Sequence, residues 1–151
     1  MQNIKILNKK EIKSILELIK NQWGASADMD YAFLKTDKGK IYVVNSDISK
    51  LELGKLRINS IGLYFAEIRD EGIRLSIEGS QIIGPKSKKS ALELNDNEAK
   101  EWMRGNDLEM KGDFSGFLII KHKEDFLGCG KYANGKILNY IGKARRVNSI
   151  I

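Results

Sequence analysis

The feature of this chain that most constrains its fold is the order in which helix and strand signals follow one another. Asn8 stands three residues before Glu11, which is the spacing of a capping box at a helix N-terminus. An apolar stripe at three- and four-residue spacing follows, as expected for one buried helix face. That stripe consists of Ile12, Ile15, Leu16 and Ile19. The pattern predicts an amphipathic helix that ends near Gly24.

Short apolar segments bounded by turn residues follow this helix. Asp37, Lys38 and Gly39 lie between two of them and predict a β-hairpin. We expect strands at residues 31–36, 40–45, 61–68, 74–78, 116–121, 126–128 and 137–141, with a bend from Gly79. We expect short helices at residues 46–53 and from Asn95 or Asp96 to Met103. This mixture of one longer helix, two short helices and mostly short strands predicts an α+β fold.

Composition places the chain among globular proteins. It has 151 residues, of which 42% are hydrophobic, enough for one domain or two small domains that share an interface. No segment approaches the roughly 20 unbroken apolar residues of a membrane helix, and the charged N-terminus does not resemble a signal peptide. Cys129 is the single cysteine, so no intramolecular disulfide forms. We therefore expect a cytoplasmic protein without a membrane partner.

Charge is unevenly distributed in the second half of the chain, although the net charge is only +6. Residues 93–113 carry mostly acids, whereas residues 121–151 carry mostly cations. One interpretation is simple charge balance between two surface elements. Another is that the acidic segment, or the N-terminal part, holds a protein partner. In that case the chain is an adaptor that recruits an RNA-modifying enzyme or a ribosomal protein.

The segment from Phe126 to Arg146 combines glycines, amide side chains, a pair of tyrosines and five cations with almost no acid. Lysine and arginine neutralise phosphates, and single-stranded RNA is read by stacking on aromatic rings and by hydrogen bonds from amides. A glycine hairpin with an ordinary lysine-rich surface would show the same composition. The segment favours nucleic acid, and RNA over duplex DNA.

Catalytic motifs have less support. Residues 130–136 match the spacing of a phosphate-binding loop, but Ile137 replaces the serine or threonine that would hold magnesium, and a strand follows where a helix is needed. Cys129 and His122 could form a nucleophile and base, which leaves a divergent RNA-modifying enzyme as an alternative. One cysteine and one histidine do not make a zinc site of the usual spacing. We predict a non-enzymatic protein with no cofactor and no metal.

Several motifs together resemble a PUA domain, the small RNA-binding β-barrel of many RNA-modifying enzymes. Residues 75–84 resemble its early strand and glycine turn, residues 101–108 its short helix and corner, and residues 117–131 its central hairpin. Residues 135–140 and 143–146 are similar to the RNA-binding C-terminal region of the Nop/Sun/fmu family of RNA cytosine-5 methyltransferases. Gly142 stands where that family usually has proline, and Leu138 replaces a frequent lysine.

The resemblance implies an organisation and a site. Residues 1–72 resemble the α/β pre-PUA domain of archaeal ribosome-biogenesis proteins, packed on a PUA-like barrel of residues 73–151. The implied partner is ribosomal or transfer RNA, with an RNA methyltransferase or ribosomal proteins as further partners in RNA modification, processing or ribosome biogenesis. The residues expected to contact RNA are Lys131, Tyr132, Lys136, Asn139, Lys143, Arg145 and Arg146, with Lys86, Lys88 and Lys89 extending the basic track.

Overall fold

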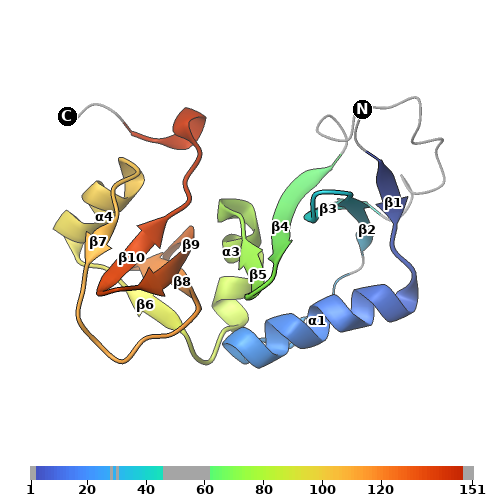
Figure 1. Ribbon diagram of the computed structural model, residues 1–151, viewed down its shortest axis with the longest axis horizontal. Helices are drawn as coiled ribbons and strands as arrows, with labels where there is room; N and C mark the ends of the chain where they lie inside the picture. The colour runs from blue at the N-terminus through green and yellow to red at the C-terminus, as the bar shows by residue number, and fades with distance from the viewer. Residues whose placement is uncertain (1–2, 28, 30, 46–61, 148–151) are drawn as a thin grey trace.

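The part of the protein that the structure describes contains two five-stranded sheets that lie side by side (Figure 1). The computed structural model describes residues 3–27, 29, 31–45 and 62–147. The helix expected at residues 46–53 lies outside them. In the described part no helix is long and apolar enough to cross a membrane.

The first sheet is an antiparallel meander of five strands, with helix α1 (Lys9–Trp23) packed against it. Its strands, in spatial order, are β1 (Ile4–Ile6), β2 (Tyr31–Thr36), β3 (Lys40–Asn45), β4 (Leu63–Arg69) and β5 (Gly72–Leu75). The capping box predicted for Asn8 and Glu11 is present, and Gly24 ends α1 in the left-handed conformation at φ 66°. The helix and the hairpin around residues 37–39 are therefore confirmed.

The second sheet is curled into a half-barrel in the order β6-β8-β9-β10-β7. Its elements are β6 (Ala91–Glu93), α4 (Asp96–Met103), β7 (Leu108–Glu109), β8 (Phe117–His122), β9 (Asp125–Ala133) and β10 (Lys136–Asn139). Asn95 caps α4 through a second capping box. Asn134 and Gly135 close the β9–β10 hairpin with positive φ at both positions, as a tight two-residue turn requires.

The segment from Arg74 to Gly84 differs from the predicted strand and glycine turn. After β5 the chain forms helix α3 (Ile77–Ile83), which continues into the 3₁₀ turn η3 (Gly84–Lys86). Ser76 begins the helix because its hydroxyl accepts a hydrogen bond from the backbone N–H of Gly79 at 2.9 Å. Gly79 lacks a Cβ where one would collide with the Phe65 carbonyl, so the helix can approach β4 closely. The predicted strand is confirmed at Arg74 and Leu75, which end β5, but was wrong beyond them, because Ser76 caps a helix whose buried residues Gly79, Ser80 and Ile83 recur at helical spacing.

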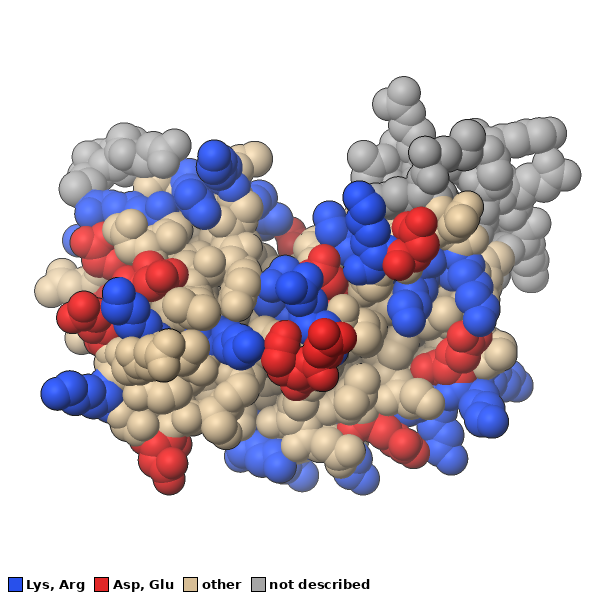
Figure 2. All heavy atoms as spheres, in the orientation of Figure 1, with Lys and Arg blue, Asp and Glu red and all other residues tan. Residues whose placement is uncertain are grey.

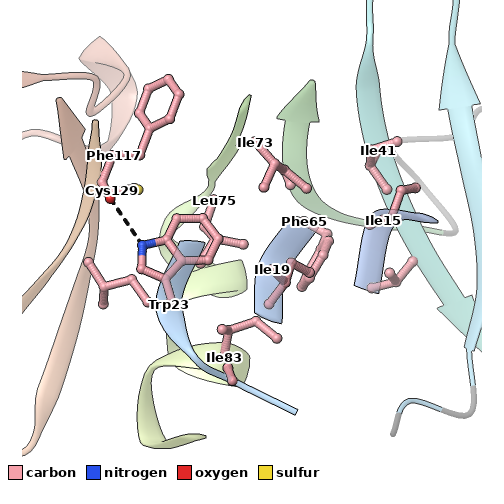
Figure 3. Close-up of a cluster of buried hydrophobic side chains, with 14 of the residues drawn as sticks. Ile15, Ile19, Trp23, Ile41, Phe65, Ile73, Leu75, Ile83, Phe117 and Cys129 are labelled. Carbon is pink, nitrogen blue, oxygen red and sulfur yellow. Dashed lines mark hydrogen bonds between the residues drawn. The ribbon is translucent and has the colours of Figure 1, made fainter. Parts of the chain in front are cut away.

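A shared hydrophobic core joins the two sheets. Trp23, at the end of α1, is fully buried, and its indole N–H donates to the Phe117 carbonyl of β8 at 3.1 Å (Figure 3). Phe117 and Ile119 of β8 face this core together with Cys129 of β9. The alternate residues Leu118 and Ile120 face a second core beneath α4. β8 is apolar on both faces because each face covers a different core.

The architecture is a mixed α/β fold with a curled β half-barrel, which agrees with the predicted class at that level. The expected pre-PUA organisation of residues 1–72 stays a prediction. The predicted boundary between residues 72 and 73 falls inside β5, which pairs with β4 from Arg69↔Gly72 to Ala66↔Leu75.

Candidate nucleic-acid interface

The segment that follows β10 forms an exposed basic edge of the half-barrel. The 3₁₀ turn η4 (Lys143–Arg145) displays its two cations to solvent. Arg145 forms an ion pair of 2.6 Å with Glu78 of α3 and still exposes about half of its side chain. Lys136 is also exposed, but it begins β10 beside the β9–β10 turn, at the end of that strand away from η4. These three cations are accessible to a polyanion.

Arg146 has a different environment from its neighbours. Its Nε donates to the Ile141 carbonyl at 3.0 Å, and its side chain lies against Gly105, where a Cβ would collide with it. The backbone N–H of the following residue, Val147, donates to the Met103 carbonyl at 2.8 Å. Arg146 and Val147 therefore hold this segment against the α4–β7 corner, so part of the role of Arg146 is structural.

Asn139 is used by the fold itself. Its side-chain amide donates to the carbonyls of Trp102 and Asn106 at 2.8 and 3.0 Å. Its side-chain oxygen accepts from the Ile141 N–H at 2.8 Å. These bonds hold the end of β10 against the corner after α4. Both N–H groups of the amide and one lone pair of its oxygen are therefore used within the protein.

Tyr132 and Lys131 are also engaged within the protein. The Tyr132 ring packs edge-on against Phe114 with centroids 5.3 Å apart, as part of the core beneath α4. Lys131 lies 3.5 Å from the Glu71 carboxylate in the β4–β5 turn and 5.9 Å from the centre of the Phe117 ring. Lys131 thus links the two sheets on the surface.

Lys86, Lys88 and Lys89 lie apart from the basic edge. The N–H groups of Lys88 and Lys89 donate to the Trp23 carbonyl, which places this connection beside the end of α1. Figure 1 shows the connection from η3 to β6 at the bottom of the view and η4 at the top. The side chains of all three lysines are exposed. The structure does not bring them together with residues 143–146.

Arg74 and Tyr140 are the pair that the sequence did not single out. Arg74 of β5 stacks on the Tyr140 ring, with 4.0 Å between the guanidinium carbon and the ring centre. Tyr140 is 39% exposed, whereas the adjacent Ile141 is buried in the core. No local signal in the sequence linked Tyr140 to Arg74.

The surface between the two sheets is hollowed around this pair. A small pocket there is lined by residues of β4, β5, α3 and β9 and by Tyr140 and Ile141. Figure 2 shows the notch between the two halves of the molecule, with lysine and arginine side chains on both sides. Burial raises the pKa of the Tyr64 hydroxyl, which lines this pocket.

The two residues considered for nucleophilic catalysis do not meet. Cys129 pairs with Ile119 in the middle of β9, and burial raises the pKa of its thiol to about 12. His122 lies at the far end of β8, where its ring contacts Asp96 at 2.8 Å. A neutral buried thiol is a poor nucleophile. Among the described residues no cluster of three or more metal-ligating side chains occurs.

The acids of residues 93–113 are largely engaged within their own region. Glu98 completes the α4 cap, and Asp96 pairs with His122. Hydrogen bonds from His122 and the charge of Lys123 lower the pKa of Asp96. Asp107 accepts from the Asn139 backbone N–H at 2.8 Å.

Gly142 occupies the position where the Nop/Sun/fmu pattern has proline. Its φ of −63° and ψ of 148° lie in the polyproline region, which a proline ring also adopts. The backbone therefore follows the path that proline would impose, despite the different residue.

Comparisons with known proteins agree with this geometry. Residues 89–147 match the family model of the methyltransferase RsmF PUA domain. The chain is 32% identical over 117 residues to the ribosomal RNA small subunit methyltransferase F of Erwinia tasmaniensis, covering 77% of this chain and 24% of that protein. The corresponding protein of Vibrio cholerae is 30% identical over 88 residues, covering 58% of this chain and 19% of that protein.

The chain thus spans about a fifth to a quarter of the length of these relatives. A crystal structure of a PUA domain from Aeropyrum pernix K1, determined as a tartrate complex, has the same fold with a TM-score of 0.53 and 14% identity, covering 87% of this chain and 72% of that one. Family model, relatives and fold agree that the chain carries a PUA domain similar to the C-terminal region of the Nop/Sun/fmu RNA methyltransferases.

Proposed function

We propose that this protein is a non-catalytic RNA-binding protein that acts in the modification or processing of ribosomal or transfer RNA, or in ribosome biogenesis. The observation that carries the proposal is the PUA domain with an exposed basic edge on its last segment. The relatives are ribosomal RNA methyltransferases, which supports an RNA ligand. The buried thiol of Cys129 and its separation from His122 argue against the catalytic pair considered above.

The charges at the basic edge suit exchange with phosphate. Lys143 is exposed at η4 and Lys136 at the start of β10, and among the described residues the Arg145 side chain pairs with Glu78 at the surface. An exposed ion pair of this kind is worth about 0–1 kcal/mol, so a phosphate group can replace the carboxylate at little cost. Each cation that contacts a phosphate releases a counterion, which makes binding depend on salt.

The experiment measures the affinity of the protein for a fluorescein-labelled RNA hairpin with an unpaired loop, by anisotropy at several salt concentrations. The Lys143→Ala/Arg145→Ala variant should bind more weakly, and the slope of log K against log salt should fall by about 0.7 for each lost single-strand contact. The matched control is Lys9→Ala/Lys10→Ala, which removes two exposed lysines at the start of α1.

The proposal fails if the wild-type protein binds neither hairpin, single-stranded nor duplex RNA at low salt. It also fails for this edge if both double variants show the same slope as wild type.

We further propose that an RNA methyltransferase or a ribosomal protein is a partner. Capture of such a protein by this one, in a form that survives nuclease treatment, would support this. Retention of cellular function by Cys129→Ala and His122→Ala would support the non-catalytic role.

A further inference from the structure

Arg74 and Tyr140 form a stacked pair contributed by the two different sheets. Arg74 lies in β5 of the first sheet, and Tyr140 directly follows β10 of the second. The guanidinium carbon lies 4.0 Å from the ring centre, so it covers one face of the tyrosine. The residue nevertheless remains 39% exposed. Because the guanidinium covers one face, a ligand can approach the ring at the opposite face and the edges.

Glu67 holds Arg74 in this position. The two residues are cross-strand partners in the β4–β5 ladder, and Arg74 Nη2 lies 3.0 Å from Glu67 Oε2. Arg69 donates to the same carboxylate oxygen at 2.9 Å. Glu67 is itself buried, which fixes the carboxylate and hence the plane of the guanidinium. Two arginines on one glutamate leave a surplus positive charge beside the ring.

The pair lies near the basic edge. Arg145 reaches Glu78 of α3, the helix that directly follows β5. Lys143 lies in the same 3₁₀ turn, three residues after Tyr140. An aromatic ring with a free face therefore lies within a few residues of cations that can neutralise phosphates. Aromatic rings and backbone-tracking cations are the two components of single-strand binding sites.

We propose that Tyr140 is a stacking platform for one unpaired RNA base, that Arg74 supports the ring from behind, and that Lys143 and Arg145 neutralise the adjacent phosphates. This inference rests on the proposed RNA-binding function. Only an unpaired base exposes a face for stacking, because bases within a duplex are covered by their neighbours. The site is composite, so the first sheet contributes to RNA binding and does more than support the half-barrel.

Glu67 is then a positioning residue. It does not touch the RNA, and it acts by orienting Arg74. If Tyr140 and Arg74 acted only within the fold, their replacement would alter stability and leave RNA affinity unchanged after correction for folded protein. RNA affinity therefore distinguishes the two roles.

The test compares two RNAs, a hairpin with 2-aminopurine in its unpaired loop and a fully paired duplex of the same stem. Tyr140→Ala should weaken hairpin binding by roughly 5- to 150-fold, the range expected for one stacked base, and should abolish quenching of the 2-aminopurine. Tyr140→Phe is the matched control and should bind nearly as wild type, because it keeps the ring. Duplex affinity and the salt slope should be unchanged in both variants.

Tyr140→Leu keeps apolar cover over the neighbouring core but has no ring, so it separates loss of stacking from loss of stability. It should bind as poorly as Tyr140→Ala. The inference is overturned if wild-type protein binds the hairpin and Tyr140→Ala binds it within twofold of wild type, or if hairpin and duplex lose affinity equally. Absence of RNA binding by the wild-type protein would instead refute the proposed function itself. If Tyr140→Ala binds the hairpin normally but no longer captures a protein partner, the ring serves that partner and the inference is again overturned.

Discussion

Replacing Trp23 by phenylalanine should destabilise both sheets together, because this indole joins the end of α1 to β8 of the second sheet. Trp23 is fully buried in the core that the two sheets share, and its N–H donates to the Phe117 carbonyl at 3.1 Å. Phenylalanine keeps the aromatic contact but has no donor and a smaller volume.

The expected loss of stability has two parts. A buried carbonyl that loses its donor costs about 1–3 kcal/mol. The difference in side-chain volume, about 40 Å³, adds about 1 kcal/mol at roughly 24 cal/mol per Å³ of cavity. The free energy of unfolding should therefore fall by about 2–4 kcal/mol.

The assay is urea unfolding followed by circular dichroism and by tryptophan fluorescence. The chain has two tryptophans, so Trp23→Phe leaves Trp102 as the sole fluorescent reporter, located in the core beneath α4. Both signals should show one transition at the same lowered urea concentration. Trp102→Phe is the matched control, because Trp102 is equally buried and donates to the Leu127 carbonyl at 3.1 Å.

Two separate transitions in Trp23→Phe, with the fluorescence of Trp102 changing at the wild-type concentration, would refute the reasoning. That result would mean that the sheets unfold independently, as two domains with a weak interface. A single shifted transition would mean that the division at residues 72 and 73 does not separate two cooperative units.

Four further substitutions, at three positions, and one chemical test follow from particular contacts. Asn139→Ala removes three hydrogen bonds worth about 0.5–1.5 kcal/mol each, so it should lower the free energy of unfolding by about 1.5–4.5 kcal/mol. Thermal denaturation would show this as a lowered midpoint. Gly79→Ala should lower the free energy of unfolding by about 1–3 kcal/mol or prevent folding, because the Phe65 carbonyl occupies the place of the new methyl group. The control is Gly142→Ala, whose methyl group meets nothing within 4 Å and should change the thermal midpoint little. Gly142→Pro should raise stability by about 0.4–1 kcal/mol, since the backbone already has the proline conformation, and an unchanged or lowered midpoint would contradict this. Cys129, with a pKa raised to about 12, should resist alkylation at pH 8 in the folded protein and react after unfolding in urea. The raised pKa of Cys129 also makes the free energy of unfolding depend on pH. Its stabilising contribution is complete below the ordinary thiol pKa and should be lost as the pH rises from there towards 12.

Local signals predicted the elements well where a few neighbouring residues decide the conformation. Asn8 and Glu11 satisfy each other's backbone groups within one turn, so the start of α1 could be predicted without any tertiary information. The hairpin at residues 37–39 is local in the same way, as is the end of α1 at Gly24.

The site was less predictable, because the availability of a side chain depends on distant contacts. Asn139 and Tyr132 have the residue types of an RNA-binding surface, yet the fold uses their polar and aromatic groups to hold the second core together. The sequence predicted only that Arg74 lies in a strand, and the structure shows that its guanidinium stacks on the Tyr140 ring.

The sequence by itself determined the capped helices, the hairpins and the basic composition of the last segment, because caps, turns and charge act over a few residues. It also carried the PUA resemblance that the family match later supported. Only the tertiary structure decided that residues 77–83 are helical and that Lys86, Lys88 and Lys89 lie apart from η4. It also decided which cations remain free to meet a phosphate. Those outcomes depend on packing between segments far apart in the chain, which residue spacing alone does not encode.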